Sequence, residues 1–432
     1  MNVLCGFTVS ASLLLTAAAT SPQTRTIQLH IPADAPEGLA AVIRVPCAAV
    51  PSEPGSSEKP AWRAVGGAVP PGTPVQFVAD LDLDGKPRSG EFAWLPITVA
   101  PGQRGRTLEV PLEAAPPPAR DGVRLAVKAD QATDFMDGER LVLRYNHGPR
   151  DLDGKNDPNA VLGFIHPIIG LDGETLTQNQ PADHLHHRGL FWAWPRLERN
   201  GATLGNWWER KDMRYRPGKV FRREAGPVLA TMTAEGFWDY QTKDMPAPER
   251  VVREVVTIRV FAEAATRAAG YQAFDIDLDF FALVDGLRMA GTKTLNKGYG
   301  GLTFRWPKPP HVRIVADTKE LEKDGLLYHA VWADCSGDFP APQRKHPGTE
   351  SGVAILTDPD HPGSPPPWLF RFYGVLNVSY PGLEYVSLRR DKPLRLHYRL
   401  ILHRGSARDA RIADIYKLYA ARWTASPSPD TP

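Results

Sequence analysis

Three observations predict that this chain folds as an all-β protein. Residues 274–280 alternate strictly between apolar side chains and Asp275, Asp277 and Asp279, the pattern of an antiparallel strand with one dry and one solvated face. The 42 prolines and 37 glycines indicate frequent turns between short segments. Helical spacing of apolar residues is good in one segment, residues 407–423, so we expect a single short C-terminal helix.

The N-terminal part, residues 24–115, is expected to form a small Ig-like β-sandwich. Alternating segments at 26–31, 39–45, 75–79 and 108–112 are separated by loops rich in proline and glycine. Residues 80–91 match the letters of an EF-hand calcium loop, but Pro87 and Arg88 occupy inner positions and both flanks have the pattern of strands. A hairpin turning at Asp84 and Gly85 explains the same letters.

A proline-rich linker at 116–122 leads to a larger domain at 123–423, which we expect to be the catalytic or binding domain. Two domains suit a chain of 432 residues. Strand patterns recur in this domain at 140–145, 251–261, 274–280, 352–356 and 394–403. Residues 424–432 are expected to be a disordered tail.

Residues 1–20 have the features of a signal peptide, with an apolar stretch at 9–19 and small residues at its end. We therefore expect an exported protein, periplasmic or extracellular. No later apolar run approaches the ~20 residues of a membrane helix. A formal net charge of +2 gives no reason to expect nucleic acid as a partner. Cys47 and Cys335 fall in different expected domains, so two free thiols are favoured over a disulfide.

The run from Asp183 to Gly189 is the strongest candidate for a functional site, because it joins three histidines, a carboxylate and a guanidinium beside two tryptophans. As a strand, it would place on one face His184, His186 and Arg188, and on the other Asp183, His187 and Gly189. An apolar core cannot hold so many polar groups without partners. The run is thus expected to form the polar floor of a cleft walled by Trp192 and Trp194; the alternative is a solvated turn with satisfied histidines.

Two chemical uses of these histidines remain open. His184 and His186 can act in general acid–base catalysis, because an imidazole titrates near physiological pH. They can also share a divalent metal, with a third ligand drawn from His166, Asp183, Glu209 or His397. A cofactor is otherwise not indicated. The expected catalytic residues are His184, His186, Asp183 and Glu209.

Tryptophans near polar clusters indicate what the site binds. Aromatic faces beside Asp, Arg and His are typical of a sugar site, although the same large residues can simply fill a sandwich core. The tryptophans in question are Trp192, Trp194, Trp207, Trp208, Trp306, Trp332 and Trp368. The residues expected to hold a saccharide are Arg188, Trp192, Trp194, Arg305, Arg371 and His187.

Residues 140–405 resemble the PmoA-like family of exported bacterial proteins, which has no settled function. The resemblance rests on four blocks, of which the Asp-His-x-His-His-Arg-Gly run at 183–189 is the most specific; the others are at 164–173, 206–209 and 368–374. The family's strand pattern is similar to a galactose-mutarotase-like supersandwich, which implies a carbohydrate ligand. The methane-oxygenase label of that family implies instead a metal-dependent oxygenase.

Taken together, the sequence predicts an exported protein that acts on a saccharide as a hydrolase, lyase or epimerase. A non-catalytic glycan-binding or scaffold protein is the alternative, and a metal-dependent oxygenase is the second alternative. If His184 and His186 share a cleft with Arg188, at least one of the two imidazoles should have a folded pKa below its unfolded value, because like charges oppose protonation.

Overall fold

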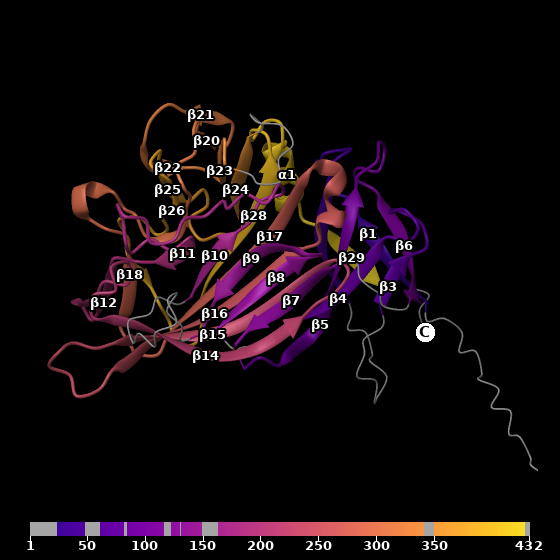
Figure 1. The fold of residues 1–432 in the computed structure, drawn as a ribbon. Helices are drawn as coiled ribbons and strands as arrows, with labels where there is room; N and C mark the ends of the chain where they lie inside the picture. The colour runs from indigo at the N-terminus through magenta and orange to yellow at the C-terminus, as the bar shows by residue number, and fades with distance from the viewer. Residues whose placement is uncertain are drawn as a thin grey trace, which may run out of the picture.

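The computed structural model describes residues 24–47, 61–81, 84–115, 122–129, 131–148, 163–340 and 350–427. In these residues strands form four antiparallel sheets and a single α-helix is present, which confirms the expected all-β fold (Figure 1). The expected signal peptide at 1–20 and residues 116–121 of the expected linker lie outside the described residues.

The N-terminal strands, drawn in indigo and purple in Figure 1, form a seven-stranded sheet together with the yellow C-terminal strand. In spatial order these described strands are β2 (Ala40–Cys47), β5 (Pro87–Thr98), β4 (Pro74–Leu81), β3 (Ala61–Ala64), β6 (Thr107–Ala115), β1 (Thr24–His30) and β29 (Thr424–Pro427). The last strand differs from the expectation, because residues 424–427 were assigned to a disordered tail. β29 instead pairs with β1, with Thr424 opposite His30. A C-terminal strand is therefore the edge strand of the N-terminal sheet.

Two nine-stranded sheets make up the larger part of the described chain. The first sheet contains β22 (Gly325–His329), β25 (Pro367–Arg371), β26 (Val375–Val378), β19 (Gly301–Arg305), β11 (Leu190–Ala193), β10 (Phe164–Ile168), β9 (Arg140–Asn146), β8 (Ala132–Asp137) and β7 (Val123–Lys128). The second contains β14 (Met213–Glu224), β15 (Leu229–Tyr240), β16 (Glu249–Phe261), β17 (Tyr271–Ala282), β28 (Leu394–Arg404), β24 (Ser351–Thr357), β23 (Trp332–Gly337), β20 (Arg313–Ala316) and β21 (Lys319–Leu321).

The remaining elements are small. A four-stranded sheet contains β13 (Ala202–Gly205), β12 (Arg196–Arg199), β18 (Leu287–Ala290) and β27 (Val386–Ser387). Single 3-10 turns lie at Glu263–Ala265, Arg267–Ala269 and Thr294–Asn296. The helix α1 spans Ile412–Ala420, which is shorter than the expected 407–423, because Arg411 before it adopts a left-handed φ of 57°. With nine residues α1 is too short to cross a membrane, and the described ranges hold no other candidate.

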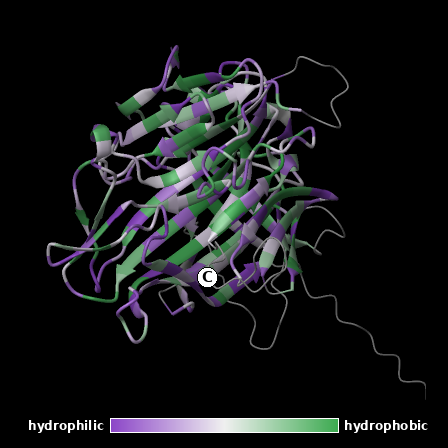
Figure 2. Ribbon diagram, turned by 60° about the vertical axis from the view of Figure 1, so that its left-hand side comes forward, coloured by the Kyte–Doolittle hydropathy of each residue, from purple (hydrophilic) through white to green (hydrophobic). Residues whose placement is uncertain are grey.

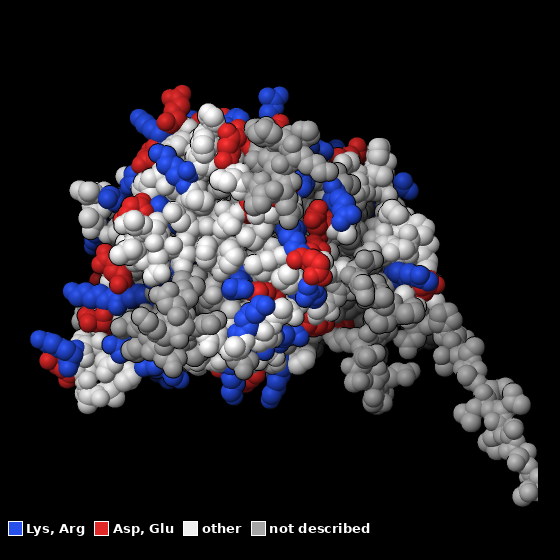
Figure 3. All heavy atoms as spheres, in the orientation of Figure 1, with Lys and Arg blue, Asp and Glu red and all other residues white. Residues whose placement is uncertain are grey.

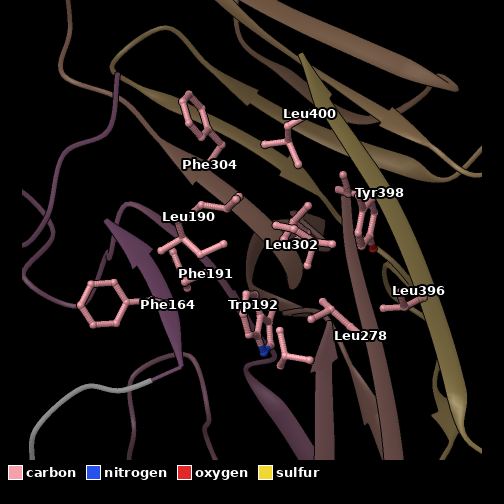
Figure 4. Packing of buried hydrophobic residues seen from close by; sticks show 14 of the residues in the cluster. Phe164, Leu190, Phe191, Trp192, Leu278, Leu302, Phe304, Leu396, Tyr398 and Leu400 are labelled. Atoms are coloured by element: carbon pink, nitrogen blue, oxygen red, sulfur yellow. The ribbon is translucent and has the colours of Figure 1, made fainter. Parts of the chain in front are cut away.

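The two nine-stranded sheets enclose one buried apolar core, as expected of a supersandwich. This core forms because alternate side chains of a strand point to the same face of its sheet. On β17 the side chains on the core face are all fully buried: Phe274, Ile276, Leu278 and Phe280. Figure 4 shows Leu278 in this core with Leu302 and Phe304 from the facing sheet. Along the ribbons in Figure 2, green apolar and purple polar positions accordingly alternate on many strands.

A second core joins the N-terminal sheet to the larger part. It contains Ile43 and Trp94 of the N-terminal sheet, Phe261 and Ile401 of the second large sheet, and Ile412 of α1. Because this core draws on all three, the N-terminal sheet packs firmly against the outer face of the second large sheet and is not a loosely attached module.

This contact also corrects the expectation for the three aspartates of β17. Their face of the strand is not simply solvated: Asp275 is 7 % exposed and accepts two hydrogen bonds, of 2.7 and 2.9 Å, from Arg399. Arg399 also donates to the carbonyl of Val42 in β2. Asp277 pairs with Arg259 and lies 3.0 Å from Nδ1 of His397. Ion pairs on this face therefore lie beneath the N-terminal sheet.

Two further expectations concern the N-terminal sheet and the cysteines. β4 ends at Leu81 and β5 begins at Pro87, so the EF-hand letters do fall on a hairpin, and Asp80 is paired with Arg44 at 2.8 Å. Cys47 is half-buried and Cys335 is buried, and both are free thiols, as expected. On the face of the molecule in Figure 3, basic and acidic side chains are interspersed, which agrees with the small net charge.

Candidate functional site

The polar run at 183–189 lies at one end of four neighbouring strands. Leu190 of β11 stands opposite Phe304 of β19, and Arg305 stands opposite Val375 of β26. The run that precedes β11 therefore meets the segment after β19 and the turn between β25 and β26. Antiparallel pairing thus brings together residues that are more than a hundred positions apart in the sequence.

The run itself forms consecutive turns and not the expected strand. The amide of His184 donates to the carbonyl of Pro181, and the amide of His187 donates to the carbonyl of His184, both at 2.9 Å. Gly189 ends the run with a φ of 43°, and a Cβ at this position would lie 2.4 Å from the carbonyl oxygen of Ile165. Glycine is needed here because the backbone of the run passes directly against β10.

The turns gather the three imidazoles into one stack, in place of the two faces that a strand would give them. The ring of His184 lies between His187, at 4.6 Å, and Tyr373, at 5.1 Å, and is nearly parallel to both. His186 meets His187 edge-on at 4.7 Å and His184 at 5.8 Å. Trp208 contacts the other side of His187 at 5.7 Å.

The carboxylate of Asp183 contacts the stack and also binds Arg305. Nη2 of Arg305 donates to both oxygens of the Asp183 carboxylate, at 2.9 and 3.0 Å, and Nδ1 of His184 lies 3.0 Å from the same carboxylate. Burial works against ionisation of Asp183, but the contact with His184 and the charge of Arg305 outweigh it and lower the pKa of the carboxyl. The carboxylate of Asp183 therefore contacts both the stacked imidazole of His184 and the guanidinium of Arg305.

Two clefts open beside the stack, and both are lined by His186 and Glu209. One has a volume of about 780 Å³ and is also lined by Arg188, Arg210 and Tyr215. The other has a volume of about 530 Å³; its further lining includes His184, His187, Trp208, Lys297, Tyr299, Arg371 and Tyr373. Volumes of several hundred Å³ suit a small-molecule ligand, and His186 and Glu209 lie between the two clefts, since both residues line each of them.

The environment keeps the inner imidazoles neutral. Burial lowers the pKa of His187 to about 2, and the neighbouring His186 and His184 add to the effect. Burial and then the charge of His184 lower the pKa of His186, while Glu209 acts in the opposite direction. The expected lowering within the pair is therefore present at His186, although desolvation and not charge repulsion is its largest cause. Near neutral pH, His186 is a free base.

A small inner cavity of about 10 Å³, room for about one water molecule, lies behind the larger cleft. Its lining includes Arg188, Arg210, Trp192 and Glu254. Glu254 of β16 is 1 % exposed, and its Oε2 accepts hydrogen bonds from the indole nitrogens of Trp192, at 3.2 Å, and Trp238, at 2.8 Å. Burial raises the pKa of Glu254 to about 7, although the three hydrogen-bond donors around it oppose the change.

Several residues expected in the site lie elsewhere. Trp194 is fully buried and donates to the carbonyl of Tyr380, and Trp192 lines the inner cavity but neither cleft. Trp306 and Trp368 are also fully buried, so the core-filling interpretation holds for them. Arg305 lines neither cleft, because it is 3 % exposed and bound to Asp183. Arg371 does line the smaller cleft, paired with Asp324 at 3.0 Å.

The proposed metal ligands do not converge. Nδ1 of His166 lies 2.9 Å from the hydroxyl of Thr177, and burial lowers the pKa of this imidazole to about 4. His397 belongs to the ion pairs beneath the N-terminal sheet. Among the residues that the structure describes, no group of three or more His, Cys, Asp or Glu side chains has the arrangement of a metal site.

Sequence reasoning missed Glu254, Arg210, Tyr299 and Tyr373. A signal for Glu254 was present: in the strand at 251–261 it falls on the same face as Val252, Val256 and Ile258, which are buried. A carboxylate in phase with the apolar face of a strand predicts a buried ionisable group. No pattern pointed to the tyrosines, because they come from turns that only the tertiary fold brings to the clefts.

Comparisons with known proteins place the chain in a family. No curated protein matches this sequence. Similar solved structures include a protein in glycosyl hydrolase family 38 from Enterococcus faecalis (11 % identity, TM-score 0.46) and an alpha-mannosidase from Enterococcus faecalis V583 (12 %, 0.44). Both alignments cover 94 % of this chain but 48 % and 46 % of the solved chains, so it spans about half of their length. Residues 132–417 match a family described as being of unknown function, and the chain therefore belongs to that family, DUF6807.

Proposed function

We propose that this protein is carbohydrate-active and that His186 and Glu209 form the centre of its site. The observation that carries the proposal is that both clefts, of about 780 and 530 Å³, share these two side chains as lining. A ligand that occupies both clefts must pass over an imidazole and a carboxylate. An extended oligosaccharide has the shape for this, with one sugar residue in each cleft and the linkage between them at the pair.

The chemistry proposed for this pair is proton transfer. His186, which is neutral near pH 7 because its pKa is lowered, accepts a proton from a sugar hydroxyl or carbon acid. Glu209 is exposed, and its carboxyl group is the second proton-transfer group, beside His186, of the proposed hydrolase, lyase or epimerase. His184, whose Nδ1 lies 3.0 Å from the Asp183 carboxylate, supplies a second imidazole in the smaller cleft. Asp183 and Arg305 act as positioning residues.

Aromatic and cationic side chains around the smaller cleft supply the binding surface. Tyr299 and Tyr373 are half-buried in its lining, and tyrosine rings stack against the C–H faces of sugars. Arg371 and Lys297 offer donors for hydroxyl groups. His187, which is buried, packs behind the ligand surface between His184 and Trp208.

The test is turnover of a glycan panel by the wild-type protein and by His186→Ala and His184→Ala. We expect the first substitution to lower kcat at least a hundredfold, since general acid–base catalysis contributes about 10² to 10⁴ in rate. His311→Ala is the control, because His311 is exposed, pairs with Asp338 and lines neither cleft. Turnover that continues unchanged in both site variants would refute the catalytic proposal.

A non-catalytic glycan-binding protein is the second candidate, and the aromatic lining of the smaller cleft favours it. It predicts saturable binding without product, lost in Tyr299→Ala and retained in His186→Ala. A metal-dependent oxygenase, as the PmoA-like resemblance implies, predicts copper or iron bound stoichiometrically after purification, which elemental analysis measures. Export to the periplasm or the cell exterior is part of the proposal and rests on the apolar stretch at 9–19.

A further inference from the structure

We infer that the saccharide is acidic, and that its anionic group binds to Arg188 and Arg210 at the inner end of the larger cleft. The inference rests on the proposed function, because it names the class of sugar that the same site takes. Both guanidinium groups line the larger cleft and the small cavity behind it. They therefore lie where the cleft narrows to the inner cavity.

Arg188 carries the argument, because it is a buried cation that pairs with no carboxylate of the described residues. It is 6 % exposed, and its two terminal nitrogens bond to the neutral side-chain oxygen of Gln180 at 2.8 and 3.0 Å, in the amide orientation that satisfies both residues. Its Nε has no hydrogen-bond partner among the described residues. Burial lowers the pKa of Arg188 to about 10. A buried charge is costly unless a counter-ion reaches it.

The surroundings of Arg188 add positive charge. Burial and then the charge of Arg188 lower the pKa of Arg210 to about 9, so the two guanidinium groups are close enough to repel each other. The larger cleft is also lined by Arg214 and Lys243, against two carboxylates, Glu209 and Asp212. This cleft therefore has an excess of basic residues within a molecule whose overall formal charge is only +2.

Glu254, behind the two arginines, does not neutralise them fully. Burial raises the pKa of this carboxyl group to about 7, which weakens it as a counter-ion for the two arginines near neutral pH. Its charge acts on Arg210, which is also repelled by Arg188. A carboxylate on the ligand can accept charge-assisted hydrogen bonds from the guanidinium hydrogens that Gln180 leaves unused and from Arg210. The hexuronic acids are sugars that carry such a group.

The experiment is calorimetric titration of the full chain with four oligosaccharides of equal length and linkage. These are a hexuronic acid oligomer, its methyl ester, the neutral hexose oligomer, and the neutral oligomer carrying sulfate esters. We expect the acid to bind at least tenfold more tightly than the ester and the neutral sugar, since one hydrogen bond to a charged group contributes about tenfold or more. Tight binding of the sulfated oligomer would assign the anion as a sulfate ester, and tight binding of the uronate would assign it as a carboxylate.

Variants separate this inference from the proposed function. Arg188→Gln should remove the preference for the acidic oligomer and raise or leave unchanged the melting temperature, because a structural arginine would instead lower it on removal. Arg63→Gln, which removes an exposed charge on the N-terminal sheet, is the charge-matched control. If Arg188→Gln does not fold, two other tests take its place. The first is the preference of Arg188→Lys for the acidic oligomer, and the second is whether added salt weakens binding of that oligomer to the wild type.

Equal affinities for the acid and its ester, or an unchanged preference in Arg188→Gln, would overturn the inference and leave the proposed function standing. Binding of inorganic sulfate as tightly as the sulfated oligomer would also overturn it. If no oligosaccharide of any charge binds, the proposed function fails and the inference fails with it.

Discussion

Replacing Glu254 with glutamine should change how the stability of this protein depends on pH. Glutamine keeps the shape of the side chain, and its carbonyl oxygen can still accept the hydrogen bonds from Trp192 and Trp238. What the substitution removes is the ability to ionise. The hydroxyl of Tyr215, the third donor beside this carboxyl group, can donate to the amide oxygen in the same way.

The magnitude follows from the pKa. Burial raises the pKa of Glu254 from 4.5 to about 7, and one pKa unit corresponds to about 1.4 kcal/mol. Below pH 4.5 the carboxyl is protonated in the folded and the unfolded chain alike. Between pH 4.5 and about 7 only the unfolded chain ionises, so stability is lost as pH rises. Above pH 7 the loss is complete, at about 3 kcal/mol.

The assay is urea unfolding of the wild type and of Glu254→Gln at pH 5 and pH 8, followed by the same comparison for Glu139→Gln, whose side chain is 98 % exposed. The difference in unfolding free energy between Glu254→Gln and the wild type should grow by about 2 to 3 kcal/mol from pH 5 to pH 8, while the control pair stays constant. A difference that does not change with pH would mean that Glu254 is solvated or already ionised in the folded protein, and the buried position would be refuted.

Three further predictions concern the imidazole stack and its surroundings. His187, whose pKa burial lowers to about 2, should destabilise the fold as pH falls below its unfolded value of 6.5, so His187→Gln should flatten the loss of melting temperature between pH 7 and 5. Asp183→Asn should cost about 1 to 3 kcal/mol in urea unfolding, because it leaves the buried Arg305 without its carboxylate; an unchanged midpoint would contradict that pairing. Tyr299→Ala should weaken glycan binding about two- to tenfold in calorimetry with little change in melting temperature, whereas Trp194→Ala should destabilise by about 3 to 5 kcal/mol; the reverse pattern would show that the roles are exchanged.

The fold was predictable where side chains alternate with period two. Residues 274–280 and 394–403 lie within β17 and β28 of the second large sheet, because one face of each must be buried. The pairing of the last strand, β29, with β1 was not predictable, since residues 424–427 lack the alternation of a long strand and gain their partner only through the tertiary fold. The burial of the β17 aspartates was also not predictable from local sequence, because the N-terminal sheet that covers them comes from a distant part of the chain.

The site was predictable in composition but not in geometry. The polar density of residues 183–189 marked a segment that the structure places beside two clefts, because so many charged and imidazole groups need partners when they are buried. Whether it is a strand or turns depends on Gly189 and on hydrogen bonds to residues 178–181, which a local pattern does not encode. The expectation for the tryptophans was wrong for a related reason: Trp192 and Trp194 follow the polar run in sequence, but Trp192 on β11 and Trp194 directly after it are both buried.

The most direct test of the account is a crystal structure of the protein soaked with the glycan that binds most tightly in the titrations. The account predicts a sugar residue in each of the two clefts, with the linkage between them in contact with His186 and Glu209 and a ring against Tyr299 or Tyr373. Density for the glycan on the N-terminal sheet, or anywhere that leaves His186 and Glu209 untouched, would contradict it.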